Sequence, residues 1–530
     1  MPPKAAPKKI HFLTNRQNQL AAKKRPTRLK DRQRFPFESL HLDSAGPAPL
    51  YRQLEEQLRQ AIWQGTLKTN APLPASRQLA SLLNIARNTV IRAYEQLAVE
   101  GFIQARPGAG HRVAEVLPAR APSKVSARID APDKPEPKLS PRLSRRCATL
   151  ARVNDFIGPQ RHTSEPLPFR AHLPDYKEFP ANIWRQLYSR RLKHSSHFWQ
   201  LAVHPCGYWP LRQAVADYLV TARGMSVVPE QVVITAGVQQ SFELLAKIFI
   251  DPGDPVIFED PAYTPAATVF AMAGATNTYV DVDSEGLVVD ALPTGGAKLL
   301  YTTPASHFPL GISQSQARRK ALLAWASKTS SIILEDDYNG EHRYRGRPLT
   351  TLHGMATAGQ VIYLGSFSKL LFPALRLGYM VVPETLIEPI AAARWLLDRH
   401  SPPLEQAVLT DFINGGHFLR HLRRMRALYA QRQAQCIASL ERHLGEWLSV
   451  EALDGGLHLI AELRAGLKSE AFVAAAKNAN VELSAVAQFA SEHYAKAQSQ
   501  LIFGYAAYGE AEMEAAARKL ARQFAELSTQ

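Results

Sequence analysis

The sequence predicts a multidomain protein in which a small N-terminal α+β domain precedes a large α/β domain. At 530 residues the chain is too long for a single hydrophobic core. Short helical patterns and two strand-like runs occupy residues 37–114, whereas strands alternate with helices over residues 168–530. Residues 115–167 between them combine Lys, Arg and Ser with eight prolines, which is typical of a flexible linker.

The region 37–114 predicts three helices and a β-hairpin. Residues 49–66 repeat apolar side chains at helical spacing, and the segments LPASRQLASLL and NIARNTVIRAYEQLAVEG follow as shorter helices. Next comes GFIQARPGAGHRV, two short strands around a Pro-Gly-x-Gly turn. This order indicates a winged helix-turn-helix that reads the DNA major groove. A generic helical module is the alternative, and the solvent-facing cluster Arg87, Asn88, Thr89 and Arg92 argues against it.

The large domain contains a motif that predicts a pyridoxal 5'-phosphate (PLP) site. In GSFSKLLFPALRLG, residues 365–378, Lys369 directly follows Ser368, lies three residues after Ser366 and precedes Arg376 by seven residues. Hydroxyl groups and a guanidinium are good ligands for a phosphate dianion. A nearby cation lowers the pKa of a lysine amine toward nucleophilic reactivity, as a Schiff base requires. A solvated loop lysine is the alternative for this motif taken alone.

Two upstream segments predict further cofactor contacts. Residues 231–250 indicate a strand, a tight Ala-Gly turn and a helix that begins near Val238, so Val238 and Gln239 would bind the same phosphate through free backbone N–H groups. The strand PVIFEDPAYT ends in Tyr263, the flat side chain that we expect to stack on the PLP ring.

A second buried strand, SIILEDDYNG, ends in acids. An Asp here would pair with the protonated pyridine nitrogen of PLP, and we assign this role to Asp336, with Tyr338 at the phenolate oxygen of the cofactor. Asp337 stays an alternative to Asp336, because successive side chains of a strand point to opposite faces.

Six segments of residues 204–382 follow one another in a characteristic order: GYWPLRQAVADYLVTARG, TAGVQQ, EDPAYT, the TP…FP-x-G loop, EDDY and SFSK. In this order they resemble the fold-type I aminotransferases. The fold implied is a large mixed-sheet domain with a small C-terminal domain. The resemblance also implies that Lys369 is the cofactor lysine, that Asp336 meets the pyridine nitrogen, that Tyr263 stacks on the ring and that Ser366 and Arg376 bind the phosphate.

Residues 49–113 resemble the GntR-type winged helix. Carried over by position, the DNA contacts of that family are Arg77, Arg87, Asn88, Thr89, Gly108 and Gly110. Ala86 stands where the family usually has Ser. Loss of an N-cap hydroxyl costs roughly 0.5–2 kcal/mol, so we expect this recognition helix to fray more than those of its relatives.

The two parts together are identified as a member of the MocR subfamily of bacterial transcription regulators. This resemblance implies a cytoplasmic homodimer that binds a double-stranded DNA operator and senses PLP, or PLP joined to a small amine or amino acid. The first alternative is a PLP-dependent aminotransferase with an accessory DNA-binding domain. The second, a DNA-binding protein whose large domain has lost its cofactor, is disfavoured because every expected PLP contact is present.

Two departures concern the ligand. Many aminotransferases bind the substrate carboxylate with an arginine near the final strands, but no arginine lies between Arg464 and Arg518, and only Lys496 and Gln500 are polar candidates there. This absence argues against efficient transamination. His307 occupies a loop position where relatives usually have glutamine. It is either a contact of the cofactor or effector, or a histidine on the surface of the loop.

Composition favours a polyanionic partner. The net charge is +16 and the pI is about 9.7. Residues 1–36 predict a basic disordered tail that adds nonspecific attraction to phosphate, unless the true start lies further along. The three cysteines have neither metal nor disulfide spacing, which indicates a reducing cytosol and no metal site. No apolar run approaches membrane-spanning length.

Overall fold

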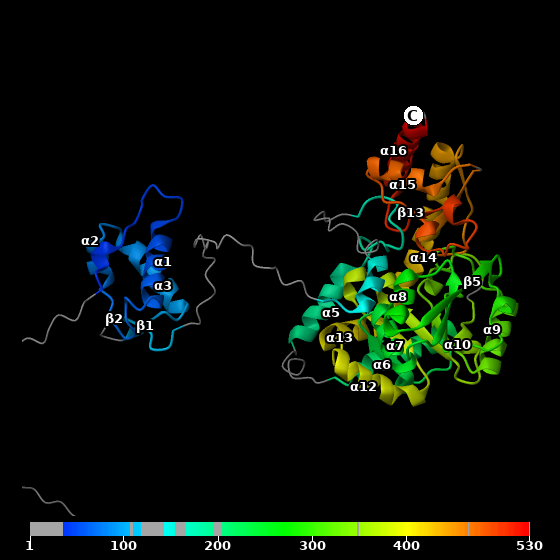
Figure 1. Ribbon diagram of the computed structural model, residues 1–530, viewed down its shortest axis with the longest axis horizontal. Coiled ribbons are helices and arrows are strands. Elements are labelled where there is room, and N and C mark those ends of the chain that lie inside the picture. Colours follow the sequence, from blue (N-terminus) through cyan, green and yellow to red (C-terminus); the bar gives the residue numbers. More distant parts are fainter. Residues whose placement is uncertain are drawn as a thin grey trace, which may run out of the picture. The chain divides into compact units, whose positions relative to one another are not determined.

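The computed structural model describes residues 35–106, 110–117, 142–153, 166–193, 203–346, 349–464 and 466–528. The chain forms two compact units, residues 1–140 and 141–530 (Figure 1). The predicted basic tail lies almost wholly outside the described residues, and so does most of the predicted linker.

One described part of that linker is not coil. Arg145–Val153 forms a 3-10 helix, η2, that lies against helix α8 (Thr264–Ala273). No proline occurs between Pro141 and Pro159. Every residue of this stretch therefore has a backbone N–H, and the chain can form a helical turn.

The N-terminal unit is a winged helix, as the sequence predicts. After the short η1 (Phe37–Ser39) come α1 (Leu50–Trp63), α2 (Ser76–Leu82) and α3 (Arg87–Val99). Strands β1 (Ile103–Arg106) and β2 (Gly110–Val113) pair antiparallel and form the wing. Leu54, Leu58, Val90, Tyr94 and Leu97 are almost fully buried and join α1 to α3.

The large unit is built on an eight-stranded mixed sheet with the order β3-β10-β9-β8-β7-β4-β5-β6. The strands are β3 (Val232–Thr235), β4 (Pro255–Asp260), β5 (Thr276–Asp283), β6 (Gly286–Leu287), β7 (Leu299–Thr302), β8 (Ile332–Asp336), β9 (Val361–Ser366) and β10 (Gly378–Val381). Strands β4, β5, β7, β8 and β9 run parallel, whereas β10 is antiparallel to both its neighbours and β6 is antiparallel to β5.

Helices cover both faces of this sheet, which explains the continuous apolar runs of its strands (Figure 1). On β9, Ile362 and Leu364 pack toward α7 (Val238–Phe249), α8 and α12 (Ile387–Leu397). The alternate residues Val361 and Tyr363 face the other side. That side is covered by α6 (Trp209–Arg223), α9 (Gln316–Thr329), α10 (Leu352–Met355) and α13 (Pro403–Asn414).

The small C-terminal domain contains a four-stranded antiparallel sheet with the order β11-β12-β14-β13. Its strands are β11 (Leu448–Val450), β12 (His458–Leu463), β13 (Ser484–Ala485) and β14 (Gln500–Gly504), and its helices are α15 (Ser469–Asn478) and α16 (Glu510–Ser528). The long α14 (His417–Leu444) leads into it; α5 (Ala181–Lys193) packs on α13, and α11 (Phe367–Leu370) follows β9. Short 3-10 helices are η4 (Pro229–Gln231), η5 (Val289–Ala291), η6 (Gly340–His342), η7 (Pro373–Leu375), η8 (Glu384–Leu386), η9 (Val486–Gln488) and η10 (Ala497–Ser499).

Residues 167–172, here called the strap, run along the last strand of the small domain. Phe169 is fully buried and packs edge-on against Phe503, with ring centroids 5.2 Å apart. The N–H of Gly504 donates to the carbonyl of Phe169 at 2.9 Å. A Cβ at Gly504 would stand 2.0 Å from the carbonyl oxygen of Arg170, so only glycine allows this close approach.

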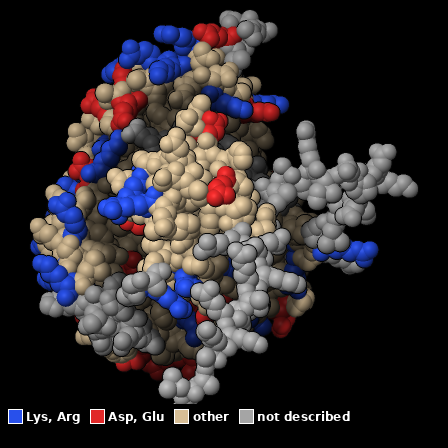
Figure 2. Space-filling view, turned by 90° about the vertical axis from the view of Figure 1, so that its left-hand side faces the viewer, with Lys and Arg blue, Asp and Glu red and all other residues tan. Residues whose placement is uncertain are grey.

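Charge is distributed unevenly along the sequence. Residues 1–34, outside the described part, contain eleven lysines and arginines and one aspartate. In the face shown in Figure 2, basic side chains are spread among acidic ones and do not gather in one continuous patch. Of the described helices, none is long and apolar enough to cross a membrane.

Candidate cofactor site and DNA-reading surface

A cavity of about 320 Å³ lies where the carboxyl ends of β7, β8 and β9 meet the strap and the small domain. Its described lining residues are Arg170, Ala171, His172, Val238, Tyr263, Tyr301, Phe308, Asp336, Tyr338, Ser366, Lys369, Glu482, Ser484, Gln488 and Phe489. Six of the residues predicted to contact the cofactor therefore line one cavity. They are Val238, Tyr263, Asp336, Tyr338, Ser366 and Lys369.

Lys369 lies in α11, directly after β9, and its Nζ donates a hydrogen bond to the carbonyl of His172 at 2.9 Å. Burial lowers the pKa of Lys369 to about 8; the charge of Asp336 opposes this effect and that of Arg170 adds to it. A substantial fraction of the amine is therefore uncharged near neutral pH, as nucleophilic attack on a carbonyl group requires.

The two neighbouring acids at the end of β8 point to different surroundings. Asp336 lines the cavity, where its Oδ2 accepts from Tyr301 at 2.8 Å and its buried Oδ1 has no hydrogen-bond partner among the described residues. Asp337 instead pairs with Arg223 and accepts from Tyr363 at 2.7 Å. Burial raises the pKa of Asp336 to about 7. A free, buried carboxylate oxygen fits a protonated ring nitrogen of the kind that PLP carries.

Three groups of the kind that binds a phosphate lie close to one another at the start of α7. Val238 is the first residue of α7, and Gly237 before it adopts φ 104°. The guanidinium of Arg376 lies 3.6 Å from the position that a Cβ of Gly237 would occupy, and Ser366 lines the cavity beside Val238. The N-terminus of a helix, a hydroxyl and a guanidinium together fit a phosphate dianion.

Three predicted cofactor contacts do not line the cavity. Gln239 is partly exposed as the second residue of α7, and Arg376 is exposed. The Oγ of Ser368 is buried without a hydrogen-bond partner among the described residues.

Tyr263, in contrast, lines the cavity. Its ring packs edge-on against Phe308 at a centroid distance of 5.2 Å, and burial raises the pKa of its hydroxyl to about 12.

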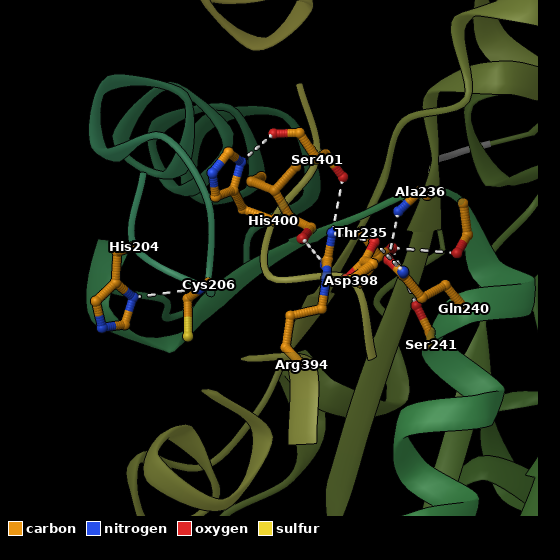
Figure 3. A network of polar contacts seen from close by, with 12 residues as sticks. His204, Cys206, Thr235, Ala236, Gln240, Ser241, Arg394, Asp398, His400 and Ser401 are labelled. Atoms are coloured by element: carbon orange, nitrogen blue, oxygen red, sulfur yellow. Dashed lines mark hydrogen bonds and ion pairs between the residues drawn. The ribbon is translucent and has the colours of Figure 1, made fainter. Parts of the chain in front are cut away.

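A polar network centred on a buried arginine supports the turn that precedes α7 (Figure 3). Arg394, fully buried in α12, donates to the carbonyl of Ile234 at 2.7 Å and pairs with Asp398. The Nε2 of Gln240 donates to Asp398 at 2.8 Å, while its Oε1 accepts from the N–H of Ala236 at 2.8 Å. The network thereby holds the end of β3 and the first turn of α7 in one arrangement.

Much of the cavity wall was not anticipated from the sequence. The residues missed are Arg170, Ala171, His172, Tyr301, Phe308, Glu482, Ser484, Gln488 and Phe489. Tyr301 could have been found, because it lies near the carboxyl end of a parallel strand, where ligands of α/β sheets bind. The strap and the small-domain residues have no local motif and are distant in sequence from Lys369.

The other residues considered for ligand binding lie elsewhere. His307 is 2% exposed, lies 3.8 Å from Glu259 and does not line the cavity, so it is neither a surface histidine nor a lining residue. Burial lowers the pKa of His307 to about 3. The Oε1 of Gln500 accepts from Tyr494 at 3.1 Å, and Lys496 pairs with Glu462 at 3.1 Å, both outside the cavity.

The predicted recognition helix is α3. Arg87 and Asn88 are exposed at its start and Thr89 is partly exposed. The Nε of Arg87 donates to the hydroxyl of Ser76 at 3.4 Å, which links α3 to α2. Ala86 is the N-cap and provides no side-chain hydrogen bond, as the sequence led us to expect.

The remaining predicted DNA contacts surround this helix. Arg77 is exposed on α2, and the guanidinium of Arg92 lies over the ring of Tyr51, 4.4 Å from its centroid. Gly110 opens β2 with φ 75°, a conformation that favours glycine. Gly108 lies outside the described residues.

Comparison with known proteins assigns the family. Residues 50–113 match the model of bacterial regulatory proteins of the gntR family, and residues 186–520 match that of aminotransferases class I and II. The probable rhizopine catabolism regulatory protein MocR of Rhizobium meliloti is 36% identical over 468 residues, which cover 88% of this chain and 92% of the relative. The chain belongs to the MocR subfamily of GntR-type transcription regulators.

Other relatives agree with this assignment. The transcriptional regulator TauR of Rhodobacter capsulatus is 31% identical over 77% of this chain and 83% of its own length. The pyridoxine biosynthesis regulator PdxR of Corynebacterium glutamicum is 29% identical over 78% and 83%. This MocR-type chain is therefore a DNA-binding transcription regulator with an aminotransferase-like domain, and the alternative of an aminotransferase with an accessory DNA-binding domain is not favoured.

The large unit also resembles solved enzymes. The kynurenine aminotransferase of Pyrococcus horikoshii, crystallised with PMP, superimposes with a TM-score of 0.63 at 26% identity over 73% of this chain and 95% of the enzyme. This likeness supports a PLP-type cofactor site in the MocR-type regulator.

Proposed function

We propose that this regulator binds PLP in the 320 Å³ cavity, with Lys369 as the cofactor lysine, and that a ligand reaching this site changes how the winged helix binds its operator. The observation that carries the proposal is the position of Lys369. Its amine is buried, has a lowered pKa and shares a cavity with Val238, Ser366 and the carboxylate of Asp336, one oxygen of which has no hydrogen-bond partner among the described residues.

The roles of the surrounding residues follow from their chemistry. Asp336 would accept a hydrogen bond from the pyridine nitrogen, Tyr338 would contact the phenolate oxygen and Tyr263 would lie against the ring. The phosphate would be bound by Val238, Gln239, Ser366, Ser368 and Arg376. Primary amines condense reversibly with an aldehyde, and this is the chemistry that PLP would supply here.

DNA binding is assigned to the winged helix. We propose that Arg87, Asn88 and Thr89 enter the major groove, since they are the polar residues at the start of α3. Arg77, Arg92, Gly108 and Gly110 are proposed as supporting contacts. A homodimer in the cytoplasm, which the family resemblance implies, would present two readers and favour a repeated half-site.

Two kinds of signal are compatible with this site. One relative is named for pyridoxine biosynthesis, for which PLP itself is a suitable signal, and another for rhizopine catabolism. In either case a ligand shifts the operator-binding equilibrium only through different affinities for two conformations. Movement of the small domain against the large one is the two-state element that we propose.

The test combines absorption spectra with DNA binding. A double-stranded fragment selected by the full-length protein from a random pool serves as the operator, and its affinity is measured with and without PLP and candidate amines. We expect PLP, or PLP with an amine, to change the affinity. Lys369→Ala should reduce that response and leave basal DNA binding intact, whereas Lys247→Ala, exposed in the last turn of α7, should behave as wild type.

Two results would contradict the proposal. An absorption band retained in Lys369→Ala would place the reactive amine elsewhere. Steady-state conversion of an amino acid to its keto acid at an ordinary enzymatic rate, of order 1 s⁻¹ or more, would favour an enzyme instead.

A further inference from the structure

The cavity contains an arginine that does not come from the final strands of the chain. Among the described residues that line it, Arg170 is the arginine, and it belongs to the strap. Many aminotransferases have a carboxylate-binding arginine near the final strands. In this chain the final strand, β14, has Gln500, which hydrogen-bonds to Tyr494 outside the cavity. The guanidinium thus enters from a different segment that runs alongside the same strand.

The backbone of Arg170 is held firmly at this place. Gly504 of β14 donates to the carbonyl of Phe169, and its missing side chain leaves room for the carbonyl of Arg170. The neighbouring Phe169 is fully buried in the core of the small domain. The backbone of Arg170 is therefore fixed in place, while its side chain, about half exposed, reaches the cavity.

The guanidinium retains most of its hydrogen-bonding capacity. Its nearest acidic partner is Glu482, with Nε and Oε1 3.5 Å apart, and this contact orients the side chain without occupying its terminal NH₂ groups. A planar pair of N–H donors is the group that binds a carboxylate in two-point geometry.

Arg170 also differs from the other basic groups around the cavity. His172 lines the cavity and His458 lies beside it, with ring centroids 4.4 Å apart, and burial holds the pKa of both well below its ordinary value, so both are uncharged at neutral pH. Once Lys369 is engaged by the cofactor, Arg170 is the permanent cation among the described lining residues. Arg170 and Lys369 line the same cavity, and the charge of Arg170 helps to lower the pKa of Lys369.

We propose that Arg170 binds a carboxylate of the effector, and that the effector is therefore a primary amine that carries a carboxylate. This inference rests on the proposed function, since the amine of such a molecule would react at the cofactor while its acid is held by the strap. The strap would then be the part of the large unit that detects whether the acid is present.

The experiment compares matched ligands on the PLP-loaded full-length protein. Glycine, 3-aminopropanoate and 4-aminobutanoate are each paired with an alkylamine of similar length that lacks the carboxylate, and the half-saturating concentration is read from the absorption change. For at least one pair, wild type should prefer the acid by about tenfold or more, the usual contribution of a charged hydrogen-bonded pair. Arg170→Gln should abolish this preference by weakening the response to the acid far more than the response to the alkylamine, and Arg170→Lys should retain part of it.

Arg185→Gln is the control, because Arg185 is exposed on α5 outside the cavity, and it should keep the wild-type preference. Equal responses to acid and alkylamine in wild type, or a preference that survives Arg170→Gln, would overturn the inference while the absorption band of Lys369 still supported the cofactor site. Failure of the protein to bind PLP at all would overturn both.

Discussion

The rate at which this protein captures PLP should depend on pH through the buried amine of Lys369. With a pKa of about 8, roughly 10% of the amine is uncharged at pH 7, against about 0.03% for a lysine at 10.5, a difference of about 300-fold in the reactive fraction. The capture rate should rise about tenfold per pH unit below 8 and level off above it.

The assay mixes cofactor-free protein with PLP from pH 6 to 10 and follows absorbance in a stopped-flow instrument. Each rate is divided by that of a free lysine derivative after the latter has been corrected for the derivative's own uncharged fraction, and this removes the pH dependence of PLP itself. The residual curve should level off near pH 8 in wild type, and Lys369→Ala should show no band. Because the Asp336 carboxylate raises the pKa of the amine, Asp336→Asn should move the break to lower pH. A rate that keeps rising to pH 10, or a break that Asp336→Asn moves upward, would refute the reasoning.

Four further predictions address other parts of the chain. Arg376→Ala should raise the Kd for PLP in equilibrium dialysis while saturating PLP still produces the band, and an unchanged Kd would remove Arg376 from the site. Arg87→Ala should cost about 1–3 kcal/mol at one base pair if it contacts a base edge, or weaken all sequences and lower the salt slope if it contacts phosphate; full operator affinity after loss of both Arg87 and Thr89 would exclude the winged helix as the reader. Ala86→Ser should protect the first amides of α3 in hydrogen exchange by about 0.5–2 kcal/mol, and no added protection would mean that the hydroxyl does not cap the helix. Gly504→Ala, whose Cβ would meet a carbonyl at 2.0 Å, should destabilise the large unit by about 1–3 kcal/mol in urea unfolding, and unchanged stability would show that the strap can move aside.

Local features of this protein could be predicted from the sequence because they depend on neighbours a few residues away. Helical spacing and the turn residues predicted the winged helix, and the Ala-Gly turn predicted a helix beginning at Val238, where α7 begins. The motif of serines and Arg376 around Lys369 is likewise a local pattern. The 3-10 helix η2 was missed, since the composition of the linker as a whole concealed a stretch without proline.

What the sequence left open was decided by contacts between distant segments. Strand alternation placed Asp336 and Asp337 on opposite faces, but only the packing of the sheet determined that Asp336 faces the cavity and that Asp337 pairs with Arg223. Arg170 enters the cavity because its strap packs against a strand more than 300 residues further along the chain, where Gly504 leaves room for it. Such a meeting depends on the whole tertiary fold, and no spacing near Arg170 or Gly504 encodes it.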